Sequence, residues 1–304
     1  MPIPIAYFGV VLIWSTTPLA IAWSGQAAGF VFGLTSRMLL GLVLAFIFAA
    51  LLNKRILWHK QALLAYLYGG LGIYGGMLSV YWAAQFIPSG LVSLLFGLTP
   101  IFTSILAIFW LKDELITRYR IMGMLFGFLG LLVVFGQSIT WGEQAVWGVC
   151  SVIVSGLIHV TSAIWVKRVN AHVPAISMTA GTLSVATPLL FITWLTTSPD
   201  WQGLSQTLTT APSHTTLAIL YLALFGSVFG FSLYFHVLKH VEATKVALIA
   251  LMTPITSLFL GYYLNNESIT PQIILGASLI IGGLAIFELG GKPLPKWVPF
   301  RPNV

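Results

Sequence analysis

Two ionisable side chains lie inside long apolar stretches, and they are the first candidates for chemistry. Arg37 lies in TSRMLLGLVLAF, and His159 lies in SVIVSGLIHVTSAIWV. Ionisable groups at the depth of a membrane core are functional candidates because their burial in lipid is costly. An arginine there binds a substrate carboxylate through two parallel hydrogen bonds, satisfies carbonyls at a broken helix, or snorkels outward to the interface. A histidine there binds substrate, carries a proton near neutral pH, or bonds as a neutral ring to the hydroxyl of Ser155 or Ser162.

Two Thr-Pro pairs lie near the middle of apolar stretches. Pro100 and Pro254 each remove a backbone hydrogen bond and free a carbonyl, and such helix breaks are tolerated where the backbone is buried in protein or lines a cavity. The neighbouring hydroxyls of Thr99 and Thr253 either face a substrate or bond back to their own helix.

Aromatic residues make up 13% of the chain, and most are expected to pack in the core or at the membrane interfaces. Tyr81 and Tyr234 occupy equivalent places in a repeat, near opposite membrane faces. That arrangement suits a pair of gates, and it equally suits two interfacial residues. The side chains predicted to line a central cavity are Trp14, Ser15, Arg37, Tyr74, Phe96, Thr99, His159, Trp165 and Thr253.

The composition indicates which elements must hold these side chains. Of 304 residues, 58% are hydrophobic and 7% are charged, and the mean hydropathy is +0.96. Such a chain lacks the polar surface of a water-soluble domain, so we predict an all-α integral membrane protein. A β-barrel is rejected, because its strands would alternate in polarity.

Ten stretches approach the roughly 20 apolar residues that a membrane-crossing helix needs. Nine is the alternative count, because the fifth and tenth stretches are short and rich in glycine. The predicted spans are Pro4–Trp23, Gly29–Leu52, Ala62–Ala84, Ser89–Leu111, Tyr119–Gly136, Ala145–Val166, Val173–Trp194, Thr216–Leu238, Val246–Leu264 and Ile273–Leu289.

The positive charges fall on one side of the predicted membrane. With the N-terminus in the cytoplasm, every Lys and Arg except Arg37 lies in a cytoplasmic loop or in the C-terminal tail, as the positive-inside rule expects. This segregation predicts an even number of spans and two cytoplasmic termini. The net charge of +7 then orients the chain and attracts anionic lipid, and it does not indicate nucleic-acid binding.

One segment occurs twice in the chain. FGLTPIFTSILAIFWLKDELIT at 96–117 has a close relative, IALMTPITSLFLGYYLNNESIT, at 249–270. Each half then holds five spans, an odd number, so the second half enters the membrane in the opposite orientation. We predict a first five-helix repeat at 1–140, a second, inverted repeat at 141–290, and a cytoplasmic tail at 291–304. Inverted repeats are typical of secondary transporters, which bind substrate between the halves.

The stretches LIWSTTPLA at 12–20 and TSRMLLGLVLAF at 35–46, with the duplicated TP…E…T…G segments, carry a family resemblance. Over nearly all of its length the chain resembles the EamA-type transporters of the drug/metabolite transporter superfamily. The resemblance implies a bacterial-type inner-membrane carrier, often an exporter of amino acids or related metabolites. It also favours a structural role for Arg37, because members commonly have an arginine there whatever their substrate.

Two departures limit what the resemblance carries over. Trp14-Ser15 stands where the family usually has Trp-Gly, which weakens any inference about close helix packing there. Related small multidrug carriers bind proton and cation with a glutamate in the first helix, but nothing acidic lies between Met1 and Leu111. We therefore expect facilitated transport or proton coupling through His159.

Motifs for catalytic or cofactor chemistry are missing from the sequence. It has no phosphate-cradling P-loop, so ATP is not expected to drive transport directly. The six histidines and one cysteine show no metal-ligand spacing. We expect no cofactor, no metal and no catalytic residue.

A secondary transporter that exports amino acids or related small metabolites by alternating access is the leading hypothesis. The alternatives are a multidrug or nucleotide-sugar carrier of the same fold, a lipid scramblase and a membrane-embedded enzyme. The expected partners are a small-molecule substrate and membrane lipid. A monomer is favoured, because glycine pairs such as Gly72/Gly76 and Gly123/Gly127 suit close helix packing within one chain.

Overall fold

The computed structural model describes residues 2–26, 28–110, 118–197, 212–241, 246 and 249–289. Every regular element in these ranges is a helix. Eight helical stretches among the described residues are long and apolar enough to cross a membrane. With many large apolar side chains exposed on the outside of the bundle, this makes the chain a multi-pass membrane protein.

Each predicted span contains helix, although two of the helices are interrupted. The fourth predicted span is divided at Gly97 and Leu98, and the eighth contains a π-helical stretch. The final two helices have 17 and 19 residues, so the count of ten spans and their orientation stay predictions. The elements are α1 (Ile3–Ser24), α2 (Phe30–Leu51), α3 (Lys60–Ala83), α4 (Ser89–Phe96), α5 (Thr99–Trp110), α6 (Arg118–Thr140), α7 (Glu143–Val169), α8 (Ala175–Thr197), α10 (Ser213–Tyr221), η1 (Leu222–Phe229), α11 (Gly230–His240), α13 (Ile249–Asn265) and α14 (Pro271–Leu289).

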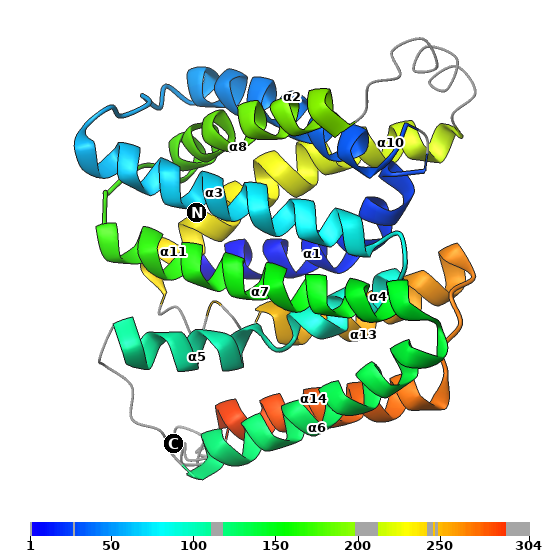
Figure 1. The fold of residues 1–304 in the computed structure, drawn as a ribbon. Helices are drawn as coiled ribbons and strands as arrows, with labels where there is room; N and C mark the ends of the chain where they lie inside the picture. Colours follow the sequence, from blue (N-terminus) through cyan, green and yellow to red (C-terminus); the bar gives the residue numbers. More distant parts are fainter. Residues whose placement is uncertain are drawn as a thin grey trace, which may run out of the picture.

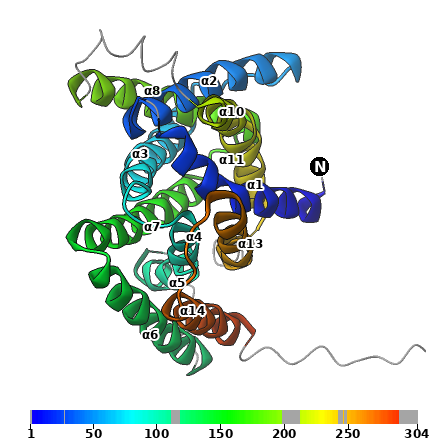
Figure 2. The same ribbon diagram turned by 90° about the vertical axis from the view of Figure 1, so that its right-hand side faces the viewer.

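The helices form one elongated bundle (Figure 1). Seen from the side turned toward the viewer in Figure 2, α2 and α8 lie at one edge, α6 and α14 lie at the opposite edge, and the remaining helices lie between them. This middle group holds most of the side chains predicted to line a cavity.

The packing partners repeat between the two halves of the chain. Helix α3 packs on α7 and α8, and in the same way α11 packs on α1 while η1 packs on α2. Helices at equivalent places in the predicted repeats also pair with each other: α2 with α8, α4 with α13, and α6 with α14. Such matching of partners is what a duplicated chain would produce.

Glycine permits the close approach of α6 and α14. A methyl group at Gly123 would lie 2.5 Å from the carbonyl oxygen of Gly283, and one at Gly130 would lie 2.7 Å from that of Gly276. Small residues of this kind let backbones approach in membranes, where there is no hydrophobic drive between helices. The predicted pair Gly123/Gly127 therefore packs within the chain, since Gly127 faces Ile101 of α5.

We predict that Gly123→Ala destabilises the protein by about 1–3 kcal/mol, because the added methyl group meets backbone that cannot move aside cheaply. Gly136→Ala is the matched control, since Gly136 lies on the same helix and has nothing within 4 Å of its added methyl group. Thermal unfolding in detergent measures both variants. Equal loss of stability in the two would contradict this account of the helix contact.

Candidate functional site

A cavity of about 160 Å³ lies in the middle of the bundle. Its lining comes from α1, α2, α3, α4, α5, α7, α11 and α13, and most of it is apolar or aromatic. Seven of the side chains singled out in the sequence line this cavity: Trp14, Arg37, Phe96, Thr99, His159, Tyr234 and Thr253. The site is therefore an apolar chamber with a few separated polar groups.

Arg37 is held in the cavity wall by neutral groups. Its side chain is 1% exposed, and its Nε donates a hydrogen bond of 2.9 Å to the Ser227 hydroxyl. Its Nη1 lies 3.4 Å from the Tyr81 hydroxyl. The carboxylate side chains that the structure describes have other hydrogen-bond partners. Glu143 accepts a bond from Trp147, and Glu267 accepts one from the backbone of Gly90 at the start of α4. The buried cation thus has no described acidic partner.

The π-helical stretch makes room for this guanidinium group. A methyl group on Gly226 would lie 3.0 Å from Nη2 of Arg37, and the next residue, Ser227, supplies the hydrogen-bond acceptor. Both residues lie in η1, and π-helical turns inside helices are frequent at functional sites. Ser227 was not predicted from the sequence. The available signal was a pair of small residues, Gly226 and Ser227, within an apolar run.

His159 presents an unpaired nitrogen. Its Nδ1 lies 2.9 Å from the backbone carbonyl of Ser155. A carbonyl only accepts, so Nδ1 carries the proton and the neutral ring keeps a lone pair on Nε2. That Nε2 is buried and has no hydrogen-bond partner among the described residues. Of the two expected hydroxyl partners, that of Ser155 lies 3.3 Å from Nδ1, whereas that of Ser162 donates to the carbonyl of Tyr68 instead.

Two ring pairs form aromatic surfaces of the cavity. Trp14 and Tyr234 lie with ring centroids 5.1 Å apart, and Phe96 meets His159 edge-on at 5.9 Å. Gly76 lies directly against the His159 ring, since a methyl group there would be 2.1 Å from Cε1. Tyr234 was predicted to lie near the inner membrane face. Its ring partner, Trp14, lies in the middle of α1, and both residues line the central cavity.

The two threonines behave differently. Thr99 donates back to the carbonyl of Phe96 at 2.8 Å, where α4 has ended and α5 begins just before Pro100. The hydroxyl of Thr253 instead accepts a hydrogen bond of 3.2 Å from Ser93 and so joins α13 to α4. Helix α13 continues through Pro254, so only the first of the two Thr-Pro pairs coincides with an interruption.

Three side chains expected to line the cavity lie outside its lining. The Tyr74 hydroxyl bonds to Thr193 of α8 at 3.0 Å. The Trp165 ring packs against Tyr68 and Trp110. Ser15 bonds back to the carbonyl of Val11 in its own helix. A span that is apolar on all sides does not reveal which of its faces meets a cavity.

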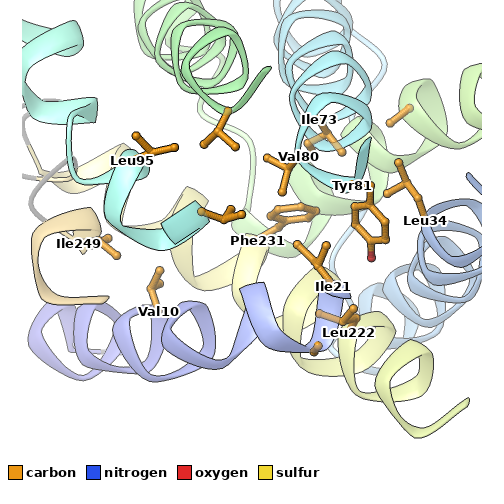
Figure 3. Close-up of a cluster of buried hydrophobic side chains, with 14 of the residues drawn as sticks. Val10, Ile21, Leu34, Ile73, Val80, Tyr81, Leu95, Leu222, Phe231 and Ile249 are labelled. Atoms are coloured by element: carbon orange, nitrogen blue, oxygen red, sulfur yellow. The ribbon is translucent and has the colours of Figure 1, made fainter. Parts of the chain in front are cut away.

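A second cavity, of about 300 Å³, lies at the end of the bundle where α4 begins and α13 ends. We call this the outer end, after the predicted topology. Ile21 lines both cavities, and Tyr81 lines the second one. In Figure 3 the side chains of Ile21, Val80 and Phe231 point into the same space beside Tyr81. Each of these four residues lines one cavity or both, and we name them the barrier layer.

Polar bonds tie helices together at the outer end. Trp23 donates to the Asn265 side chain at 2.8 Å, and Asn265 donates to Glu267 at 2.9 Å. Glu267 also accepts a bond of 3.3 Å from the backbone of Gly90, at the positive end of the α4 dipole. Sequence reasoning treated Glu267 as an ordinary loop acid, because its contact with Gly90 joins segments that are distant in the chain.

Comparison with known proteins identifies the family. The model of the EamA-like transporter family matches residues 1–136 and 146–289. The chain belongs to this family of transporters.

Relatives agree with this family, and a solved structure shares the fold. The chain is 29% identical to "Uncharacterized transporter YoaV" of Bacillus subtilis, over 82% of this chain and 83% of that protein. It is 26% identical to a "Probable amino-acid metabolite efflux pump" of Salmonella typhimurium, over 71% and 73% of the two chains. A solved crystal structure shares the fold with a TM-score of 0.68 and 18% identity, over 94% of this chain and 96% of its own.

Cysteine labelling tests the cavity wall. In a Cys150→Ser background, which removes the only cysteine, we predict that Thr253→Cys reacts with methyl methanethiosulfonate ~10-fold faster than Ser257→Cys, because the reagent must reach the thiol. Both residues are buried on α13, but only Thr253 lines the cavity, and Ser257 bonds to the Ser15 carbonyl. Intact-mass measurement over time gives the rates. Equal reaction rates of the two cysteines would contradict the placement of Thr253 in the cavity wall.

Proposed function

We propose that this protein is a secondary transporter of the bacterial inner membrane that exports amino acids or related small metabolites. Substrate binds in the central cavity, and the two five-helix repeats rock against each other to expose the cavity to one side and then to the other. The observation that carries the proposal is the central cavity itself, lined from both halves of the chain and separated from the outer end by the barrier layer.

The chain organisation supports two inverted repeats. The duplicated sequence, the matched packing partners of the halves and the segregation of positive charge each favour the same division near residue 140. An odd number of spans in each repeat gives the inverted arrangement used by many secondary transporters, with the binding site between the repeats. Both termini then lie in the cytoplasm.

The barrier layer and the polar bonds at the outer end supply a closed outer gate. Tyr81 joins Arg37 of α2 by its hydroxyl, and that hydroxyl lies 3.4 Å from Ser24 at the end of α1. The Glu267 bonds close the same end of the bundle, between α4 and the end of α13. Opening requires these few bonds to break, which keeps the energy difference between the two conformations small. Tyr81 thus fits the gate hypothesis better than the interfacial one.

Cavity size and charge favour a small metabolite over the alternatives. A volume of about 160 Å³ is below the roughly 300–1,000 Å³ of sites for drug-sized ligands. The lining contains a single arginine and, among the described residues, no carboxylate. A cationic drug lacks a counter-charge there, and a nucleotide sugar lacks the several cations that its phosphates call for. Two relatives carry the name "Probable amino-acid metabolite efflux pump", which points to amino acids and their derivatives.

Uptake into proteoliposomes tests the function. We predict saturable uptake of at least one class from a panel of radiolabelled neutral, aromatic, acidic and basic amino acids, measured with and without a proton gradient. Unlabelled nucleotide sugars and cationic drugs are predicted not to compete. Uptake of a nucleotide sugar, or no uptake of any panel member by folded protein, would overturn the proposal.

Thiol labelling in intact cells tests the orientation. In the Cys150→Ser background, an impermeant maleimide is predicted to label Gln26→Cys, whose parent residue lies at the outer end, without permeabilisation. Gln61→Cys, at the opposite end of the bundle, is predicted to need permeabilised cells. Both parent residues are exposed. The reverse pattern would overturn the proposed topology, and labelling of both in intact cells would contradict a membrane between them.

A further inference from the structure

We infer that Arg37 and His159 select the substrate as a small monocarboxylate that also carries a hydrogen-bond donor. Arg37 binds the carboxylate, and the Nε2 lone pair of His159 accepts the donor. The inference rests on the proposed transport function and names the chemical class of its substrate and the groups that recognise it.

Arg37 has unused donor capacity. A guanidinium group offers five N–H donors, and the described partners of Arg37 are two hydroxyl groups, those of Ser227 and Tyr81. Neither partner carries a charge that balances the buried cation. A carboxylate in the adjoining cavity supplies that charge and accepts two parallel hydrogen bonds from the guanidinium plane.

His159 provides the complementary acceptor. Its ring is fixed by the Nδ1 bond to Ser155 and by the contact with Gly76, so the lone pair on Nε2 has a set direction. Nε2 is buried, has no partner in the described part of the chain, and belongs to a residue that lines the same cavity. An unpaired buried acceptor carries a desolvation cost, and an ammonium, amide or hydroxyl donor of the substrate removes that cost.

The rest of the chamber suits an apolar substituent. Trp14, Tyr234 and Phe96 offer ring surfaces, and the described lining holds no acid to pair with an additional positive charge. Neutral amino acids satisfy all three requirements, since they combine a carboxylate, an ammonium donor and an apolar side chain.

A series of matched ligands tests the inference on the unaltered protein. Binding of L-leucine, 3-methylbutylamine, which lacks the carboxylate, and 4-methylpentanoate, which lacks the amine, is measured by tryptophan fluorescence and checked by calorimetry. Loss of a hydrogen bond to a charged group predicts that each analogue binds roughly 10- to 100-fold more weakly than leucine. Equal affinity of leucine and either analogue, or no binding of leucine by folded protein, overturns the inference.

Variants assign each recognition to its residue. In Arg37→Gln, leucine and 3-methylbutylamine are predicted to bind alike, because the partner of the carboxylate is gone. In His159→Asn, whose amide still donates to the Ser155 carbonyl but has no acceptor at the Nε2 position, leucine and 4-methylpentanoate are predicted to bind alike. His159→Gln is the matched control, since its oxygen restores an acceptor near that position and part of the discrimination. Discrimination that persists in both Arg37→Gln and His159→Asn overturns the assignment.

The transport assay separates this inference from the proposed function. Saturable uptake of a solute without a carboxylate, together with equal binding of the three ligands, would overturn the inference while leaving the transporter intact. An absence of uptake for every solute would remove the transporter proposal, yet the ligand series would still measure recognition by Arg37 and His159 through binding alone.

Discussion

The charge of Arg37, buried at membrane depth without a described carboxylate partner, is the constraint on which the site depends. A cation in such a place is costly, so the surrounding helices must supply polar groups in fixed positions. Ser227 and Tyr81 do so from η1 and α3. They thereby bind α2 from the first half to η1 from the second. Arg37 lines the central cavity and Tyr81 belongs to the barrier layer, so the bonds that solvate the buried charge also join the cavity wall to that layer.

Close packing elsewhere leaves the middle of the bundle free to form a cavity. Glycines bring α6 and α14 into backbone contact at one edge, and α2 packs on α8 at the other. The helices between these edges keep larger side chains, and their rings form the walls around the cavity. Outward-facing leucines and phenylalanines meet lipid.

Much of the fold was predictable because hydropathy, charge and the internal repeat are properties of the sequence itself. Arg37 and His159 were found from their depth alone, since few ionisable groups lie within the spans. The π-helical stretch that holds Ser227 was not predicted, because it has the same apolar composition as an α-helix. Tyr74 and Trp165 lie outside the lining of the central cavity, and spans that are apolar all round do not show which face points inward. The role of Glu267 at α4 depends on contacts between distant segments, which no local pattern reveals.

Movement of the two halves about the central cavity is the central claim, and distances between spin labels test it most directly. Pulsed electron paramagnetic resonance in proteoliposomes compares an outer pair at Gln26 and Asn266 with an inner pair at Gln61 and Lys239, all exposed positions, in a Cys150→Ser background. On adding transported substrate, the account predicts opposite changes, with the outer distance growing as the inner one shrinks. Unchanged distances at both ends in protein that is actively transporting would contradict it.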